Sequence, residues 1–137
     1  MMLDEAFVAH LRANGAVALD VGVRIYGAGL IDQGTAYPCL TIQQISGMDE
    51  HQSHNGRSGL ERSRWQITAW ALRHCDAVLA ATHVVNALDA FAGVLGGAGG
   101  VRVGRCQRVA RRSLGRDPES KIFGHAVDFY VLASEQL

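Results

Sequence analysis

The sequence predicts an α+β domain in which about four strands, mostly antiparallel, pack on one long helix after a short N-terminal helix, in the order α-β-β-α-β-β. Two patterns between residues 60 and 95 carry this prediction. Residues 62–71 alternate between polar and apolar side chains, as a strand with one buried face requires. From Asp76 onward, apolar residues recur every three or four positions, which is the spacing of one helix face. A sheet and a helix that share one core follow from these two patterns.

The N-terminal residues 3–14 are expected to form a short amphipathic helix. Leu3, Phe7 and Leu11 fall on one face at helical spacing, and the first turn carries two acidic residues. Residues 16–37 alternate at first as a strand would, but glycines interrupt the pattern. We expect an irregular connection there, with one short extended piece.

The first core strand is expected from Cys39 to Met48. Leu40 and Ile42 face one side of it, and the shift of the apolar position to Ile45 indicates a bulge or the end of core contact. Residues 47–59 are polar and bounded by glycine, and they are too many for a tight hairpin turn. We expect a mobile loop or arm between two paired strands, although a tolerated surface insertion explains the same composition.

The long helix is expected from Asp76 to Phe91, with Asp76 at its start as a cap or a favourable charge. The glycines from Gly93 onward end the helix and form a flexible connection. A third strand, residues 101–110, and a fourth, residues 122–133, follow with a polar turn between them. We expect the helix to pack on the sheet through Val78, Ala81, Val85 and Leu88 on the helix and Trp65, Ile67, Phe129 and Val131 on the strands.

Composition limits the class of protein. The 137 residues suit a single domain, and 13 basic against 13 acidic residues leave no net charge, which argues against a general nucleic-acid or membrane binder. Three widely spaced cysteines indicate neither a disulfide framework nor a zinc site. No apolar run is long enough to span a membrane, and the N-terminus lacks a signal-peptide pattern. We expect a soluble protein that is intracellular when it is made.

The motifs of catalysis and cofactor binding are missing from the sequence. No serine stands in a nucleophile-elbow context, and the glycines at 96–100 follow a helix, whereas a phosphate-binding loop leads into one. Asp128 is expected on the outer face of the fourth strand, away from any second carboxylate. His51 and His54 would need further ligands to hold a metal ion, and none stands at a recognisable spacing. We therefore expect no enzyme activity, no cofactor and no metal site.

Arginine is concentrated in the second and third strands. Arg62 and Arg64 alternate onto the face of the second strand that points away from the helix, and six arginines lie between residues 102 and 116. Three interpretations stay open: a solvated face balanced by acids elsewhere, ion pairs to a neighbouring copy, or contact with nucleic acid. A small nucleic-acid-binding module would need exposed aromatic residues for stacking, and only Trp70 and Tyr130 alternate outward.

Five segments together carry a resemblance to a known family. They are Arg24-Ile25-Tyr26, Tyr37-Pro38-Cys39-Leu40-Thr41-Ile42, Arg64-Trp65-Gln66-Ile67-Thr68-Ala69-Trp70-Ala71, the alanine-rich helix from Asp76, and His125-Ala126-Val127-Asp128-Phe129-Tyr130-Val131. In this order and spacing they resemble the small tail-completion, or head–tail joining, proteins of long-tailed bacteriophages. The glycine-rich connection at 96–100 and the histidine-bearing loop depart from the family pattern.

The resemblance implies a non-enzymatic virion component that is made in the host cytoplasm. Related proteins form a ring, usually hexameric, at the end of the tail tube, where they meet the head connector. The implied partners are further copies of this chain, the tail tube protein and the head–tail connector protein, with passive contact to DNA in the lumen and no membrane. A closed ring needs two different complementary patches on each subunit. We expect the interface to include Arg62, Arg64, Arg102, Arg105, Arg108, Asp49, Glu50 and Arg57.

Overall fold

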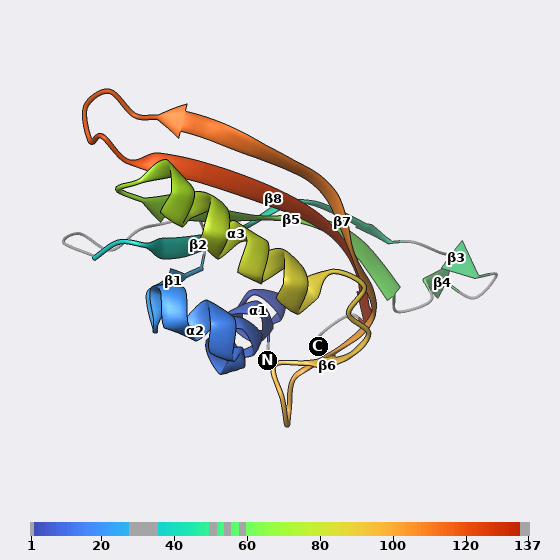
Figure 1. Cartoon of the computed structure of the whole chain (residues 1–137). Helices are drawn as coiled ribbons and strands as arrows, with labels where there is room; N and C mark the ends of the chain where they lie inside the picture. Colours follow the sequence, from blue (N-terminus) through green and yellow to red (C-terminus); the bar gives the residue numbers. More distant parts are fainter. Residues whose placement is uncertain (1, 28–35, 50–51, 54–55, 58–59, 135–137) are drawn as a thin grey trace.

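The computed structural model describes residues 2–27, 36–49, 52–53, 56–57 and 60–134. Helices cover one face of a strongly curved sheet (Figure 1). The helices are α1 (Leu3–Ala13), α2 (Gly15–Val21) and α3 (His74–Leu88). The strands of the main sheet are β1 (Ile25–Tyr26), β2 (Cys39–Asp49), β5 (Leu60–Ala71), β6 (Gly93–Leu95), β7 (Val101–Arg116) and β8 (Phe123–Ser134). A separate hairpin is formed by β3 (Gln52–Ser53) and β4 (Gly56–Arg57).

The main sheet has the strand order β1-β2-β5-β8-β7-β6. Every neighbouring pair is antiparallel except β1 and β2, which are parallel. The α+β class and the mostly antiparallel sheet are therefore confirmed. The expected count was wrong, because within the described residues the sheet has six strands rather than four and there are three helices rather than two. The added strands β1 and β6 contain two and three residues, too few for an alternating pattern to stand out.

The core lies between the sheet and the helices. Trp65, Ile67, Phe129 and Val131 are each at most 5% exposed, which confirms the expected inner face of β5 and β8. Phe7 of α1 packs on Trp65 with 5.2 Å between the ring centroids, so the N-terminal helix shares the same core. Burial of such large side chains contributes roughly 1.5–3 kcal/mol each to folding.

Helix α3 packs on this face through Ala81, Val85 and Leu88, as expected, but not through Val78. It begins at His74, two residues before Asp76, and its N-cap Arg73 makes no side-chain capping bond. Val78 is half-exposed, because the side chains that face the sheet are Ala77, Ala80, Ala81, Val84, Val85 and Leu88. Three alanines lie on this contact face, so its side chains there are small. A search for large apolar residues at helical spacing does not reveal such a face.

Residues 15–21 form helix α2, where we expected an extended and irregular chain. The side chain of Asn14 caps it by accepting hydrogen bonds from the backbone N–H groups of Ala16 and Val17, both at 3.1 Å. Val17 and Val21 are buried at helical spacing. The apparent strand alternation included Leu19, which is 87% exposed and points away from the core. The one short extended piece that we expected is present as β1.

The third strand is longer than expected, and the glycine-rich connection before it is not wholly irregular. Residues 93–95 form β6 and pair with residues 101–103 of β7, which then continues to Arg116 rather than residue 110. Register shifts that mark bulges interrupt β7 between residues 103 and 105, 108 and 110, and 113 and 115. Because each bulge resets the alternation, the sequence pattern hides the full strand. The expected bulge near Ile45 is confirmed between Gln44 and Ser46.

The segment between β2 and β5 contains paired backbone rather than only a loop. β2 and β5 stay paired as far as Asp49 and Glu61, and the β3–β4 hairpin lies beyond that end of the sheet (Figure 1). Residues 50–51, 54–55 and 58–59 lie outside the described residues. The expectation of an arm between two paired strands is thus confirmed in outline, while its mobility stays a prediction.

Candidate assembly surface

The sheet face that points away from the helices carries polar side chains from three adjacent strands. Arg64 of β5 lies opposite Tyr130 of β8, and Tyr130 lies opposite Gln107 of β7. Gln66 and Asp128 are the next outward pair along β5 and β8. The central strands therefore bring residues that are far apart in the sequence into one row.

Asp128 lies on this outer face, as expected, but it is only 3% exposed. Arg64 covers it and donates two hydrogen bonds to Oδ2, from Nη2 at 2.6 Å and from Nε at 3.2 Å. Arg112 approaches the same oxygen at 3.8 Å, and Oδ1 has no hydrogen-bond partner within the described residues. The hydrogen bond to Asp128 raises the pKa of Arg64, which is therefore committed to a pair inside its own chain.

Tyr130 forms the floor of a shallow depression beside this pair. The guanidinium of Arg62 lies 4.3 Å from the centre of the tyrosine ring, in the geometry of a cation–π contact, and that of Arg64 lies 5.8 Å away. The depression measures about 250 Å³. We call it the arginine depression, and it is lined by Arg62, Arg105, Gln107, Tyr130 and Leu132.

Trp70, the other aromatic residue on the outer face, is half-buried and already engaged. Its indole N–H donates to the hydroxyl of Thr41 at 3.0 Å. Its ring lies against Gly124, where a Cβ atom would come within 2.8 Å of the ring. With Arg62 over Tyr130 and Gly124 against Trp70, neither aromatic residue offers the open stacking platform that single-stranded nucleic acid needs.

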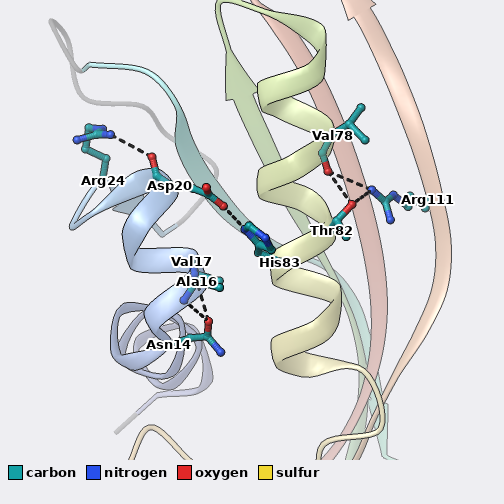
Figure 2. A network of polar contacts seen from close by, with 9 residues as sticks. All are labelled: Asn14, Ala16, Val17, Asp20, Arg24, Val78, Thr82, His83 and Arg111. Carbon is teal, nitrogen blue, oxygen red and sulfur yellow. Dashed lines mark hydrogen bonds and ion pairs between the residues drawn. The ribbon is translucent and has the colours of Figure 1, made fainter.

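The side chain of Arg111 lies on the inner face of the sheet, unlike the arginines of the outer face. It donates from Nε to Nε2 of His125 at 2.8 Å. Through Nη2 it also donates to the hydroxyl of Thr82 at 2.6 Å and to the carbonyl of Val78 at 3.2 Å (Figure 2). Burial, followed by the charge of Arg111 and then that of His74, lowers the pKa of His125. The neutral imidazole is the form that can accept the bond from Arg111. This group fastens the β7–β8 hairpin to α3.

The neighbouring residue on α3 makes the matching contact on the other side. His83 pairs with the carboxylate of Asp20 on α2 (Figure 2). The carbonyl of Asp20 also receives a bond from Arg24 at 3.5 Å. Thr82 and His83 therefore connect α3 to elements on both of its flanks, and they hold the helix layer in a fixed position under the sheet.

The structure brings part of the expected interface together. Arg62, Arg64 and Arg105 meet on the outer face, although Arg64 is already paired. Arg102 and Arg108 are exposed on β7 outside the depression. Asp49 ends β2 and Arg57 lies in β4, both at the end of the sheet where Arg62 begins the outward row, whereas Glu50 lies outside the described residues. The expectation missed Gln107 and Leu132, whose placement depends on the cross-strand register.

The described residues hold no group of three or more side chains that could ligate a metal ion. His51 and His54, the first candidates from the sequence, lie outside those residues. Cys39 and Cys106 are buried free thiols, and burial raises their pKa to about 11 and about 12, so they are protonated at neutral pH. Among the helices that the structure describes, none has the length and apolar character to cross a membrane.

Comparison with known proteins identifies a family and a similar fold. The family model described as "Tail completion protein gp17" matches residues 5–134. A chain in the solved structure titled "Virion of native gene transfer agent (GTA) particle" has a similar fold, with a TM-score of 0.72 and 18% sequence identity. That similarity covers 96% of this chain and 94% of the other chain. No curated protein matches this chain.

Proposed function

Because this chain belongs to the tail completion protein gp17 family and is therefore a structural virion component, we propose that it forms a closed ring at the head-proximal end of a phage or phage-like tail. The ring stacks on the last ring of the tail tube, ends its growth and presents a different surface to the head connector. The match over residues 5–134 carries this proposal, because it includes both the helix layer and the outer sheet face.

The geometry suits a role in assembly rather than in chemistry. Three helices cover one side of the curved sheet, and the other side carries polar side chains (Figure 1). A heterologous ring contact joins two different surfaces of neighbouring subunits, and the sheet face and the helix layer are two such surfaces. We propose six copies in the ring, with the tail tube protein on one side, the head–tail connector protein on the other and DNA passing through the lumen.

The test is to delete the gene for this protein and to examine the particles that are then made. We expect tails of uneven length that do not join heads, and we expect purified protein to restore joining by adding one ring to the head-proximal end of each tail, visible by electron microscopy. A folded variant in which every residue of the arginine depression is replaced by alanine serves as a comparison, because we expect it to restore joining only in part. Tails of normal length that join heads without this protein would contradict the proposal.

A further inference from the structure

We propose that the arginine depression of one subunit binds the acidic first turn of α1, Asp4 and Glu5, in the next subunit of the ring. The inference rests on the proposed function, since it names the surfaces through which the ring would form. It starts from an imbalance of charge within the chain. Residues 101–116 contain six arginines and no acidic residue, yet the whole chain is neutral, so the complementary charge is carried elsewhere on the same molecule.

The arginine depression offers donors that no acid neutralises among the side chains that the structure describes, which exclude residues 47–61. Within that set Arg62 and Arg105 have no acidic partner, in contrast to Arg64, which pairs with Asp128. Gln107 adds an exposed side-chain amide. Two guanidinium groups and an amide around a concave site suit a carboxylate, which accepts several charge-assisted hydrogen bonds at once.

The walls of the depression favour a protein carboxylate over a nucleic-acid phosphate. Leu132 gives it an apolar side that can receive the methylene groups of an acidic side chain. Arg62 covers Tyr130, which leaves no open ring for a base. Nucleic-acid binding also draws on a general excess of positive charge, and this chain has none.

Asp4 and Glu5 are the matching acids on the helix layer. Asp4 accepts a hydrogen bond from the backbone N–H of Glu5 at 2.9 Å, and neither carboxylate has a basic partner within the described residues. They line a groove of about 430 Å³ between α1 and β1. Arg12 lines the same groove, but it directs its donors to the carbonyls of Val23 and Ile25 at 3.0 and 3.5 Å.

The two surfaces lie on opposite layers of the subunit, so they cannot meet within one chain. α1 packs through Phe7 on Trp65 of the inner sheet face, whereas the arginine depression opens on the outer face. Contact between them therefore joins the outer sheet face of one copy to the helix layer of the next. A contact between two different patches of this kind is heterologous, and it generates a ring when its rotation closes.

Charge reversal and exchange test this pairing in the full-length protein. The variants are Arg62→Glu with Arg105→Glu, and Asp4→Arg with Glu5→Arg. A matched control, Arg73→Glu with Arg116→Glu, reverses two exposed arginines outside both surfaces. Native mass spectrometry, and electron microscopy after addition to tails that lack this protein, report the number of copies that associate. We expect each of the two interface variants to associate roughly tenfold more weakly or worse, and the control to behave as the wild type.

Mixing the two interface variants gives the decisive readout. In the mixture each reversed arginine surface can meet a reversed acidic surface, so we expect rings to return with the two variants alternating and an even number of copies. The chain that carries all four substitutions should also assemble alone. Circular dichroism on each variant separates loss of contact from loss of fold.

Three results would contradict the inference, and they differ from one another. Rings of normal mass from both interface variants would place the contact elsewhere while leaving the proposed ring intact. Loss of assembly that mixing does not restore, together with wild-type binding of duplex DNA that requires Arg62 and Arg105, would assign the depression to phosphate. A wild-type protein that stays monomeric both in solution and on tails would contradict the ring itself.

Discussion

Among single residues, the buried carboxylate of Asp128 depends on Arg64, which covers it on the outer sheet face. Replacing Arg64 with methionine keeps much of the side chain's apolar length. It removes the main partner of the Asp128 carboxylate, which is 4% exposed beneath Arg64, and among the described side chains leaves Arg112, at 3.8 Å, as the nearby cation. We expect a lower free energy of unfolding, measured by urea denaturation. The loss stays below that of a fully buried pair, because the Arg64 side chain is 31% exposed and screened by water.

The matched control for this variant is Arg62→Met, on the same strand face but without an ion pair to the described side chains. Adding Asp128→Asn to Arg64→Met should recover part of the stability, because the neutral amide is cheaper to bury without a cation. An Arg64→Met protein that unfolds at the same urea concentration as the control would show that the pair contributes nothing.

His125 makes the stability of the β7–β8 hairpin depend on pH. Its pKa in the folded protein is lowered below the ordinary value of 6.5, which the unfolded chain retains. Between the lowered pKa and 6.5 the unfolded chain therefore binds more protons than the folded one. Stability is therefore full above pH 6.5 and falls as the pH decreases through the lowered folded-state value. The physical reason is that a protonated imidazole can no longer accept the bond from Arg111 and repels its charge.

Denaturation series at pH 8, 6.5 and 5 measure this effect in the wild type and in His125→Gln, whose side-chain carbonyl accepts a hydrogen bond at every pH. We expect the difference in stability between the two proteins to shift in favour of the variant as the pH falls. Parallel pH profiles for the two proteins would assign the acid sensitivity to other groups.

The inward position of Arg111 could not be predicted from the sequence, because a bulge changes the alternation of β7 just before it. Counting by two from the buried Cys106 places Arg112 on the inner face and Arg111 on the outer one. The bulge between Arg108 and Ala110 reverses the two, so Arg111 lies opposite Val127 on the inner face. A shift of one residue thus moves an arginine from the surface to the bond network under α3.

At the scale of elements, the helix that organises the core gives the clearest test of packing. Val85 is 7% exposed on the buried face of α3. Val85→Asp would bury a charge without a partner and cost several kcal/mol, on the order of the whole stability of a small domain. We expect an insoluble or unfolded protein by circular dichroism and thermal melting.

Leu79→Asp is the control on the same helix, because Leu79 is 49% exposed and its replacement leaves the core intact. We expect this variant to melt close to the wild type. A Val85→Asp protein that is soluble and melts normally would show that α3 buries a different face.

Elements with a strong period could be predicted and short or capped ones could not. The alternation of β5 and the apolar spacing of α3 were sufficient to identify both elements and the inner sheet face. α2 was missed because seven residues contain too few turns for a helical period, and the decisive signal was Asn14 as its cap. β6 exists only by pairing with β7, which is information that its own three residues do not contain.

At the scale of the whole molecule, the family and the kind of role could be predicted from the sequence, whereas the shape of the interface could not. Five short motifs in order indicated the tail-completion family, and the family match over residues 5–134 confirms it. The arginine depression draws on β5, β7 and β8, and its outline depends on the register of three strands. Residue types alone therefore indicated arginines at an interface. They did not indicate that Arg64 pairs with Asp128, or that Arg62 and Arg105 have no acidic partner among the described side chains.

The three bulges of β7 affect how another chain can pair with this strand. β6 covers only the first residues of β7, and the loop after α3 reaches it at Cys106 and Arg108, so within the described chain the remainder of this strand is an outer border of the sheet. Bulges interrupt this border at three places, and it carries several arginines. Both features hinder another chain from pairing with it as an additional strand. This border of the sheet therefore disfavours the addition of further strands from other copies of the chain.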